Sequence, residues 1–251
     1  MDSPISAVLF DFDGVLMGSQ GALLAARQLL RSTKLRWSGA AKKLTPLDVV
    51  KIFELSDLGD NYKSLRLMYR KFRLFLPNRL ERLYFLRKMG NLYRQYDTLF
   101  GRLIPRVAEI LQELHTKGVP LAIVSNSMRK RVEKLVGQFG IRPYLSTIIT
   151  RDDMKGYEVK PSPYPILICL LKLKRILKDG KIKRQQVYFV GDLPTDIQCA
   201  RNAKVRSIAV TTGHGTREEL QAENPDHTIA GVESLFSISE FEKIRTSTSI
   251  L

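Results

Sequence analysis

The sequence has no apolar run that approaches the roughly 20 residues of a membrane-spanning helix. The best candidate, YPILICLL, leads directly into the basic segment KLKRILK. The first residues lack the basic start and the small-residue cleavage site of a secretory signal. We therefore expect no membrane span and a cytoplasmic location.

Cysteine and histidine are scarce. The two cysteines, Cys169 and Cys199, form no CxxC pair and no disulfide framework, which suits a reducing compartment. The three histidines, His115, His214 and His227, have no ligand spacing, which argues against a zinc centre. We find no internal repeat, and no low-complexity tract beyond the polar tail RTSTS.

Acidic residues are few beside the basic ones. The 251 residues include 41 Lys and Arg against 25 Asp and Glu, a net charge of +16. Residues 17–104 hold 18 of these basic and 6 of these acidic residues, a net charge of +12, together with 10 of the 20 Phe and Tyr. This shift in composition predicts a separate, strongly basic domain at residues 17–104, inserted between residues 1–16 and 105–251.

Outside the basic domain, strand-like and helix-like patterns alternate. The segments AVLF, PLAIV, LSTIIT, QVYFV and SIAVTT indicate strands, and VAEILQELHTKG, RVEKLVGQFG, PSPYPILICLLKLKRILK and PTDIQCARNA indicate helices. Strands that alternate with helices predict an α/β fold with a doubly wound parallel sheet. Residues 17–104 are predicted to be mainly helical, because LRLMYRKFRLFL and RLERLYFLRKMGNLYRQY place apolar and basic residues on opposite faces.

Polar side chains follow three of the expected strands. They are Asp11 and Asp13 after the first, Ser125 and Asn126 after the second and Asp192 after the fourth, with Lys160 in the loop VKPSP. In open parallel sheets, ligands bind at the carboxyl ends of the strands. We therefore expect these residues to converge at one edge of the sheet.

Carboxylates from two strand ends suggest a site for a hard cation. Asp11 and Asp13, with Asp192 from another strand, fit magnesium better than zinc, because magnesium prefers a few carboxylates plus water and phosphate oxygens. Gly14 allows a sharp bend and the close approach of an anion. Asp196, one helical turn beyond Asp192, is expected to steady the site, although it also suits an ordinary acid in the first turn of a helix.

The same residues can carry out phosphoryl chemistry. Asp11 can act as a nucleophile that forms an aspartyl-phosphate, and Asp13 is placed to serve as acid and base. Lys160 can supply positive charge, and Ser125 with the amides near Asn126 can hold phosphate oxygens. A simpler alternative for Ser125 and Asn126 is that they cap the helix at MRKRVEKL.

The segments DFDGVL, IVSNS, VKPSP and GDLPTDIQCA, in that order, resemble the four motifs of the haloacid dehalogenase superfamily. Two longer segments, IPRVAEILQELHTKGVPLAIVSNS and VRSIAVTTGHGTREELQAENPDHTIAGVESL, resemble its phosphoglycolate-phosphatase-like members. The resemblance covers residues 1–16 and about 104–236.

The resemblance implies a Rossmann-like core with an inserted helical cap at residues 17–104. It implies Asp11 as the nucleophile, Asp13 as the acid and base, and Ser125 and Lys160 on the phosphate. It also implies magnesium on Asp11, on Asp192 and on the backbone carbonyl of Asp13. Gly18 replaces an acid that is frequent in the family, which affects the entry into the cap more than the chemistry.

We therefore expect a magnesium-dependent hydrolase of a small anionic phosphorylated metabolite, with 2-phosphoglycolate the leading candidate by resemblance. Alternatives are a phosphomutase, a pyrophosphatase, or a non-catalytic module whose basic domain binds nucleic acid or another polyanion, although no base-reading motif favours nucleic acid. The segment LSDLGDNYKSLR, with Gly59 and Lys63, is the expected specificity loop. The sequence does not indicate the oligomeric state.

Overall fold

The computed structural model describes residues 5–18, 20–31, 44–55, 69–70, 72–155, 158–177 and 182–246. The chain forms two compact units, one of Met1–Gly18 with Leu103–Leu251 and one of Ser19–Arg102. The two segments of the first unit join where Met17 bridges to Leu103 and the amide of Ile104 donates to the carbonyl of Leu16. The expected specificity loop around Gly59 and Lys63 lies outside the described residues.

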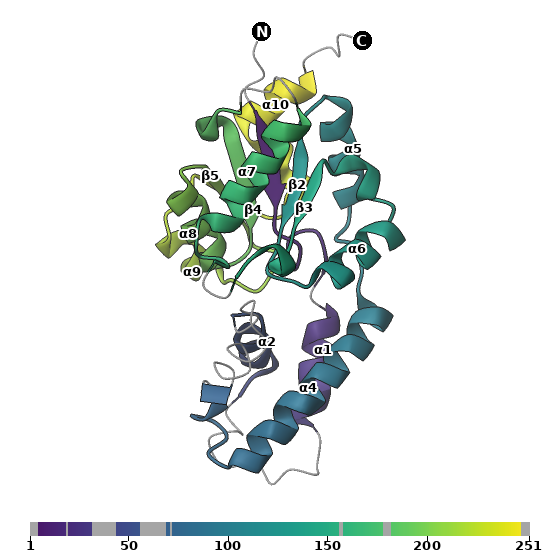
Figure 1. The fold of residues 1–251 in the computed structure, drawn as a ribbon, viewed down its shortest axis with the longest axis vertical. Coiled ribbons are helices and arrows are strands. Elements are labelled where there is room, and N and C mark those ends of the chain that lie inside the picture. The colour runs from purple at the N-terminus through teal and green to yellow at the C-terminus, as the bar shows by residue number, and fades with distance from the viewer. Residues whose placement is uncertain are drawn as a thin grey trace. The chain divides into compact units, whose positions relative to one another are not determined.

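The first unit is built on a six-stranded parallel sheet (Figure 1). The strands are β1 (Ala7–Phe10), β2 (Leu121–Val124), β3 (Thr147–Ile149), β4 (Val187–Gly191), β5 (Arg206–Val210) and β6 (His227–Ile229). Their order is β3-β2-β1-β4-β5-β6, and Val8 of β1 pairs with Leu121 on one side and Tyr188 on the other. The predicted doubly wound α/β fold is confirmed, whereas β6 was not expected.

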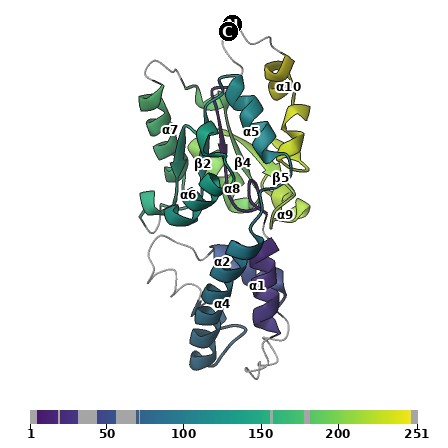
Figure 2. The same ribbon diagram turned by 90° about the vertical axis from the view of Figure 1, so that its right-hand side faces the viewer.

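Helices cover both faces of the sheet. One face packs against α5 (Val107–Thr116), α6 (Arg129–Gln138) and α10 (Ser239–Thr246), and the other against α7 (Tyr164–Ile176) and α8 (Pro194–Ala203). The short α9 (Arg217–Ala222) packs on β5 and α8 through Leu220. Figure 2 shows α7 and α10 on opposite sides of the sheet.

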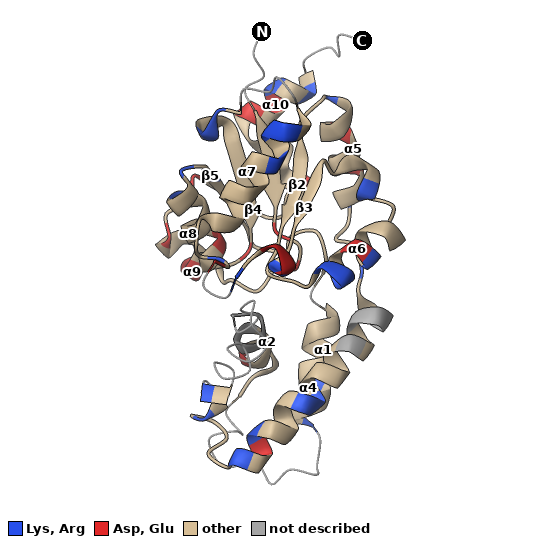
Figure 3. Cartoon of the chain, in the orientation of Figure 1, with Lys and Arg blue, Asp and Glu red and all other residues tan. Residues whose placement is uncertain are grey.

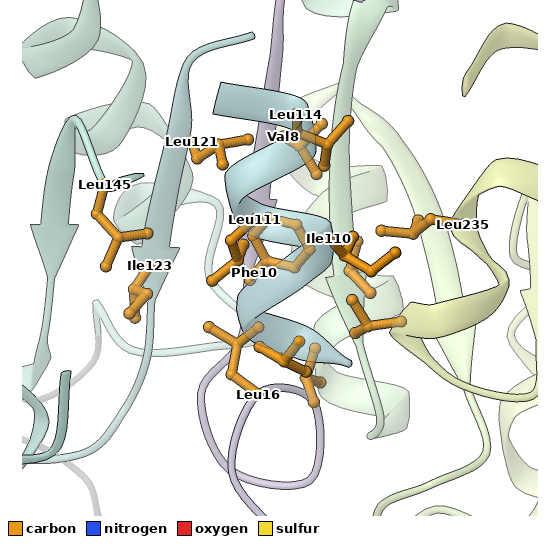
Figure 4. Close-up of a cluster of buried hydrophobic side chains, with 14 of the residues drawn as sticks. Val8, Phe10, Leu16, Ile110, Leu111, Leu114, Leu121, Ile123, Leu145 and Leu235 are labelled. Atoms are coloured by element: carbon orange, nitrogen blue, oxygen red, sulfur yellow. The ribbon is translucent and has the colours of Figure 1, made fainter. Parts of the chain in front are cut away.

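Side-chain alternation in β1 explains why both faces are covered. Val8 and Phe10 point into the cluster under α5, whereas Ala7 and Leu9 point into the cluster under α7. Figure 4 shows Val8 and Phe10 among the apolar side chains of α5. Because β1 is buried on both faces, it is a firm support for the acids that follow it.

The second unit is helical in its described part. It contains α1 (Gln20–Leu30), α2 (Pro46–Leu55) and α4 (Arg79–Phe100), and α1 packs along α4. Its core includes Leu29, Phe72 and Phe85, and the rings of Phe72 and Phe85 lie 4.8 Å apart. Figure 3 shows lysine and arginine along α4. None of the described helices in either unit combines the length and the apolar character that crossing a membrane requires.

Candidate functional site

The candidate site lies where the order of the strands reverses. The chain proceeds from β1 to β2 on one side and from β4 to β5 on the other, so the carboxyl ends of β1 and β4 flank the switch point at which such sheets bind ligands. Asp11 follows β1 and Asp192 follows β4, and the amide of Asp11 donates to the carbonyl of Val190 at 2.8 Å. The predicted convergence of these two strand ends is therefore present.

Three buried carboxylates and one lysine form the centre of the site. Asp11, Asp192 and Asp196 each place a carboxylate oxygen within 4.8 Å of the others. The Lys160 Nζ lies 2.8 Å from Asp11 Oδ1 and 2.6 Å from Asp196 Oδ1. All four side chains are buried, so three carboxyl groups lie around one ammonium in a place that water hardly reaches.

Burial dominates the proton affinities of the cluster. It raises the pKa of Asp11 to about 7, against the opposing charge of Lys160. Burial, with the neighbouring Asp196 and Asp11, also raises the pKa of Asp192 well above its usual range. Burial alone would lower the pKa of Lys160, but Asp11 and Asp196 raise it above its ordinary value, so this lysine is protonated.

The hydrogen bonds of Asp192 and Asp196 differ. Asp196 Oδ2 accepts from the amides of Asp192 and Leu193, and its other oxygen contacts Lys160. Asp192 Oδ2 accepts from the amide of His214 at 2.8 Å, whereas its buried Oδ1 has no hydrogen-bond partner among the described residues. Because a buried oxygen without a donor is costly, Asp192 Oδ1 fits a cation ligand.

Asp13 has a different environment from Asp11. The Arg131 guanidinium donates to both of its oxygens, at 2.7 and 2.8 Å, and the Ser127 hydroxyl donates to Oδ2 at 2.7 Å. Burial would raise the pKa of Asp13, but Arg131 and Ser127 together hold it below its ordinary value. Asp13 is therefore an ionised carboxylate in this structure.

Ser125 and Asn126 both accept hydrogen bonds from backbone amides at the site. Ser125 Oγ accepts from the amide of Ser127 at 3.1 Å, and Asn126 Oδ1 accepts from the amide of Lys160 at 3.3 Å. The alternative that they cap the following helix is wrong. The N-cap of α6 is Met128, which supplies no side-chain bond, and the carboxylate of Asp152 accepts from the first helical amide instead.

Gly14 lies directly against Asp192. Its φ of 77° is in the left-handed region, and a Cβ atom at this position would lie 2.3 Å from Asp192 Oδ2. Gly213, which sequence reasoning did not select, is closer still, because its Cβ would lie 1.9 Å from the same oxygen. Because neither glycine has a side chain, the Asp192 carboxylate can lie directly against the backbone at both positions.

Gly14→Ala is expected to reduce activity by about 10- to 100-fold, because a misplacement of about 1 Å at a catalytic centre has effects of this size. The left-handed φ should also cost about 1–2 kcal/mol of stability. Gly118→Ala is the matched control, since Gly118 has a φ of 73° but nothing within 4 Å of a Cβ. We expect it to lower the melting temperature similarly and to keep full activity. Equal loss of activity in both variants would contradict a specific role for Gly14.

The structure connects the eight residues selected from the sequence. Through the contacts described above, it links Asp11, Asp13, Gly14, Ser125, Asn126, Lys160, Asp192 and Asp196. Sequence reasoning missed Ser127, Arg131, Gly213 and His214. A signal existed for Gly213 and His214, because TTGHG directly follows a strand. Arg131 gave none, since it lies in MRKR among other basic residues.

Comparisons with known proteins show the family to which the chain is related. A family model for haloacid dehalogenase-like hydrolases matches residues 8–210. The phosphoglycolate phosphatase of Shigella boydii is 31% identical over 230 residues, which cover 88% of this chain and 87% of that protein. That of Vibrio parahaemolyticus is 30% identical over 146 residues, 58% of this chain and 60% of that protein.

A solved structure shares the fold. The crystal structure of a predicted phosphoglycolate phosphatase from Haemophilus somnus aligns with a TM-score of 0.71 at 23% identity, over 95% of this chain and 100% of that one. At this identity the likeness is evidence for the fold alone.

Proposed function

The chain belongs to the haloacid dehalogenase-like hydrolases, and from this premise we propose that it hydrolyses a small phosphate monoester through a phosphorylated Asp11. The proposal depends chiefly on one observation, the buried contact of 2.8 Å between Asp11 and the ammonium of Lys160 beside Asp192. Such a centre supports Asp11 as the nucleophile, because a fixed positive charge and a further carboxylate lie beside it at the sheet's switch point.

In the proposed first step, an oxygen of Asp11 attacks phosphorus in line with the departing alcohol. The new P–O bond forms as the ester P–O bond breaks, and charge spreads over the phosphoryl oxygens. Lys160, the Ser125 hydroxyl and the amide of Asn126 would stabilise that charge. Since Asp196 binds Lys160 at 2.6 Å, its role would be to keep the ammonium in place.

Asp13 would handle the proton in both steps. As a carboxylic acid it would give a proton to the departing alkoxide, and as a carboxylate it would take one from the water that attacks the phosphorylated Asp11. Its position two residues after the nucleophile, directly before the bend at Gly14, suits this role. The hydrogen bonds from Arg131 and Ser127, which lower the pKa of Asp13, favour the ionised form that the second step requires.

We further propose that magnesium binds at this centre, held by Asp11, by Asp192 and by the backbone carbonyl of Asp13. When bound, it would supply positive charge next to the phosphoryl group. The unpartnered Oδ1 of Asp192 and the excess of carboxylates over cations support this assignment.

Magnesium at a hundredfold excess over its Kd is expected to raise the melting temperature by about 5–10 °C at pH 8. The shift should be smaller at pH 5. Because the pKa of Asp11 is raised to about 7, and that of Asp192 is also raised, the folded state binds extra protons as the pH falls from 7 towards about 4, and these protons compete with the metal.

Asp192→Asn should abolish the magnesium-induced shift, and Glu218→Gln, an exposed carboxylate on α9, should leave it unchanged. Differential scanning fluorimetry with and without magnesium measures both. An undiminished shift in Asp192→Asn would contradict the metal assignment.

The proposed substrate is 2-phosphoglycolate, which the names of the two curated relatives support. We propose residues 17–104 as the cap that selects it. A kinetic screen of 2-phosphoglycolate, pyrophosphate, sugar phosphates and nucleotides with magnesium tests this choice. A preference for pyrophosphate, or conversion of glucose 1-phosphate into an isomeric sugar phosphate, would favour a pyrophosphatase or a phosphomutase. We propose the cytoplasm as the location, since Cys169 and Cys199 are free thiols.

The basic composition of residues 17–104 supports one alternative, binding of a polyanion. Salt-sensitive binding of DNA or RNA, without magnesium-dependent turnover, would favour it.

A further inference from the structure

Three hydrogen bonds hold the carboxylate of Asp13, the side chain to which the proposed function assigns proton transfer. Arg131 Nη2 donates to Oδ1, and Arg131 Nη1 and the Ser127 hydroxyl both donate to Oδ2. A carboxylate accepts about four hydrogen bonds, two on each oxygen. Three of them are therefore taken by these contacts, and the fourth direction is on Oδ1.

The guanidinium that holds Asp13 is itself fixed. Arg131 Nη1 donates to Ser127 Oγ at 3.2 Å, and the guanidinium carbon lies 5.5 Å from the centre of the Phe12 ring. The side chains of Arg131 and Asp13 are each 19% exposed. A planar guanidinium that grips both oxygens fixes the rotation of a carboxylate in a way that one ammonium cannot.

Arg131 is also unusual for its place in α6. The first turn of this helix contains Arg129, Lys130 and Arg131 and no acidic residue. Cations near a helix N-terminus oppose the helix dipole, at a cost of about 0.3–1 kcal/mol each. A residue that departs from such a local rule is often found at a functional site.

We propose that Arg131, assisted by Ser127, is a positioning residue that turns the Asp13 carboxylate so that Oδ1 faces the departing alcohol and then the attacking water. This inference rests on the proposed function, since it takes Asp13 as the acid and base. In the first step the Oδ1–H bond breaks as an O–H bond forms on the alkoxide. In the second, Oδ1 takes the proton from water as the oxygen of that water bonds to phosphorus.

The proposal predicts a dependence on the leaving group. An alkoxide needs a proton as it departs, whereas p-nitrophenolate departs well without one. Arg131→Ala should therefore lower kcat/KM for 2-phosphoglycolate by about 10- to 100-fold, part of the usual contribution of acid catalysis, and that for p-nitrophenyl phosphate less than about threefold. Arg131→Lys should show the same selective loss, because lysine keeps the charge but cannot form the bidentate hydrogen bond to both oxygens of Asp13.

A double-mutant cycle separates positioning from direct contact with the substrate. If Arg131 acts through Asp13, Arg131→Ala should change kcat/KM less than about threefold in an Asp13→Asn background. Lys130→Ala, an exposed cation of the same helical turn, is the matched control and should resemble wild type. Melting temperatures check that each variant folds.

Three outcomes would overturn the proposal. These are equal losses on the alkyl and aryl esters, effects of Arg131→Ala and Asp13→Asn that multiply, or full activity in Arg131→Lys. The proposed function fails by a different result, namely a wild-type protein whose hydrolysis does not depend on Asp11. The two failures are therefore distinguishable.

Discussion

Asp11→Asn is expected to abolish hydrolysis of both alkyl and aryl phosphates, with kcat reduced at least about 10⁴-fold, as is usual when a covalent nucleophile is removed. An amide oxygen is a poor nucleophile and leaves no carboxylate to receive the phosphoryl group. The variant should still fold. Because burial raises the pKa of Asp11 to about 7, its charge is unfavourable in the metal-free protein above that pH, and its removal should not lower the melting temperature at pH 8.

The control for Asp11→Asn is Glu218→Gln, the same change of a carboxylate to an amide at an exposed position on α9. It should retain wild-type kinetics. Turnover of Asp11→Asn within tenfold of wild type, in protein shown to be free of deamidated material, would contradict the nucleophile assignment.

Lys160→Met is expected to have the largest effect on stability. It removes the only ammonium that the described structure places against Asp11 and Asp196 and leaves buried carboxylates unpaired. Breaking a buried ion pair from one side costs about 3–5 kcal/mol, which chemical denaturation in EDTA would measure. Activity should also fall by about 10²–10³-fold, the effect of removing a group that stabilises transition-state charge.

The cost of Lys160→Met should depend on pH. The raised pKa values of Asp11 and Asp192 mean that these acids take up protons as the pH falls below about 7, so the loss of stability should be smaller at pH 5 than at pH 8. Lys172→Met is the control, because Lys172 forms a partly exposed pair with Asp153 and should cost less than about 1 kcal/mol. Equal losses of unfolding free energy in Lys160→Met and Lys172→Met would contradict the assignment of Lys160 to a buried, ion-paired centre.

Most of the fold could be predicted from the sequence because its strands are short, apolar and bounded by polar residues. β1 to β5 and the helices α5, α6, α7 and α8 are confirmed, since a strand buried on both faces leaves an uninterrupted apolar run. β6 was missed because His227–Ile229 has three half-buried residues and no such run. The short helices α9 and α10 near the C-terminus were also not predicted.

The carboxylates of the site could be predicted because the strand ends that carry them must meet at one edge of the sheet. Which cations face them is decided by tertiary packing. Lys160 gave a signal through its loop, VKPSP. Arg131 lies in a run of surface-like charges and reaches Asp13 only in the folded chain, where α6 and β1 contribute to the same apolar cluster. The catalytic roles of these residues remain predictions.

The most direct test of the central claim is chemical trapping of the phosphorylated protein. Wild-type protein quenched in acid during turnover, reduced with borohydride and digested should yield the peptide containing Asp11 with that residue converted to homoserine, as expected of an acyl phosphate. Asp11→Asn should yield none. Reduction at a different residue, or no modified peptide during sustained wild-type turnover, would contradict Asp11 as the group that carries the phosphate.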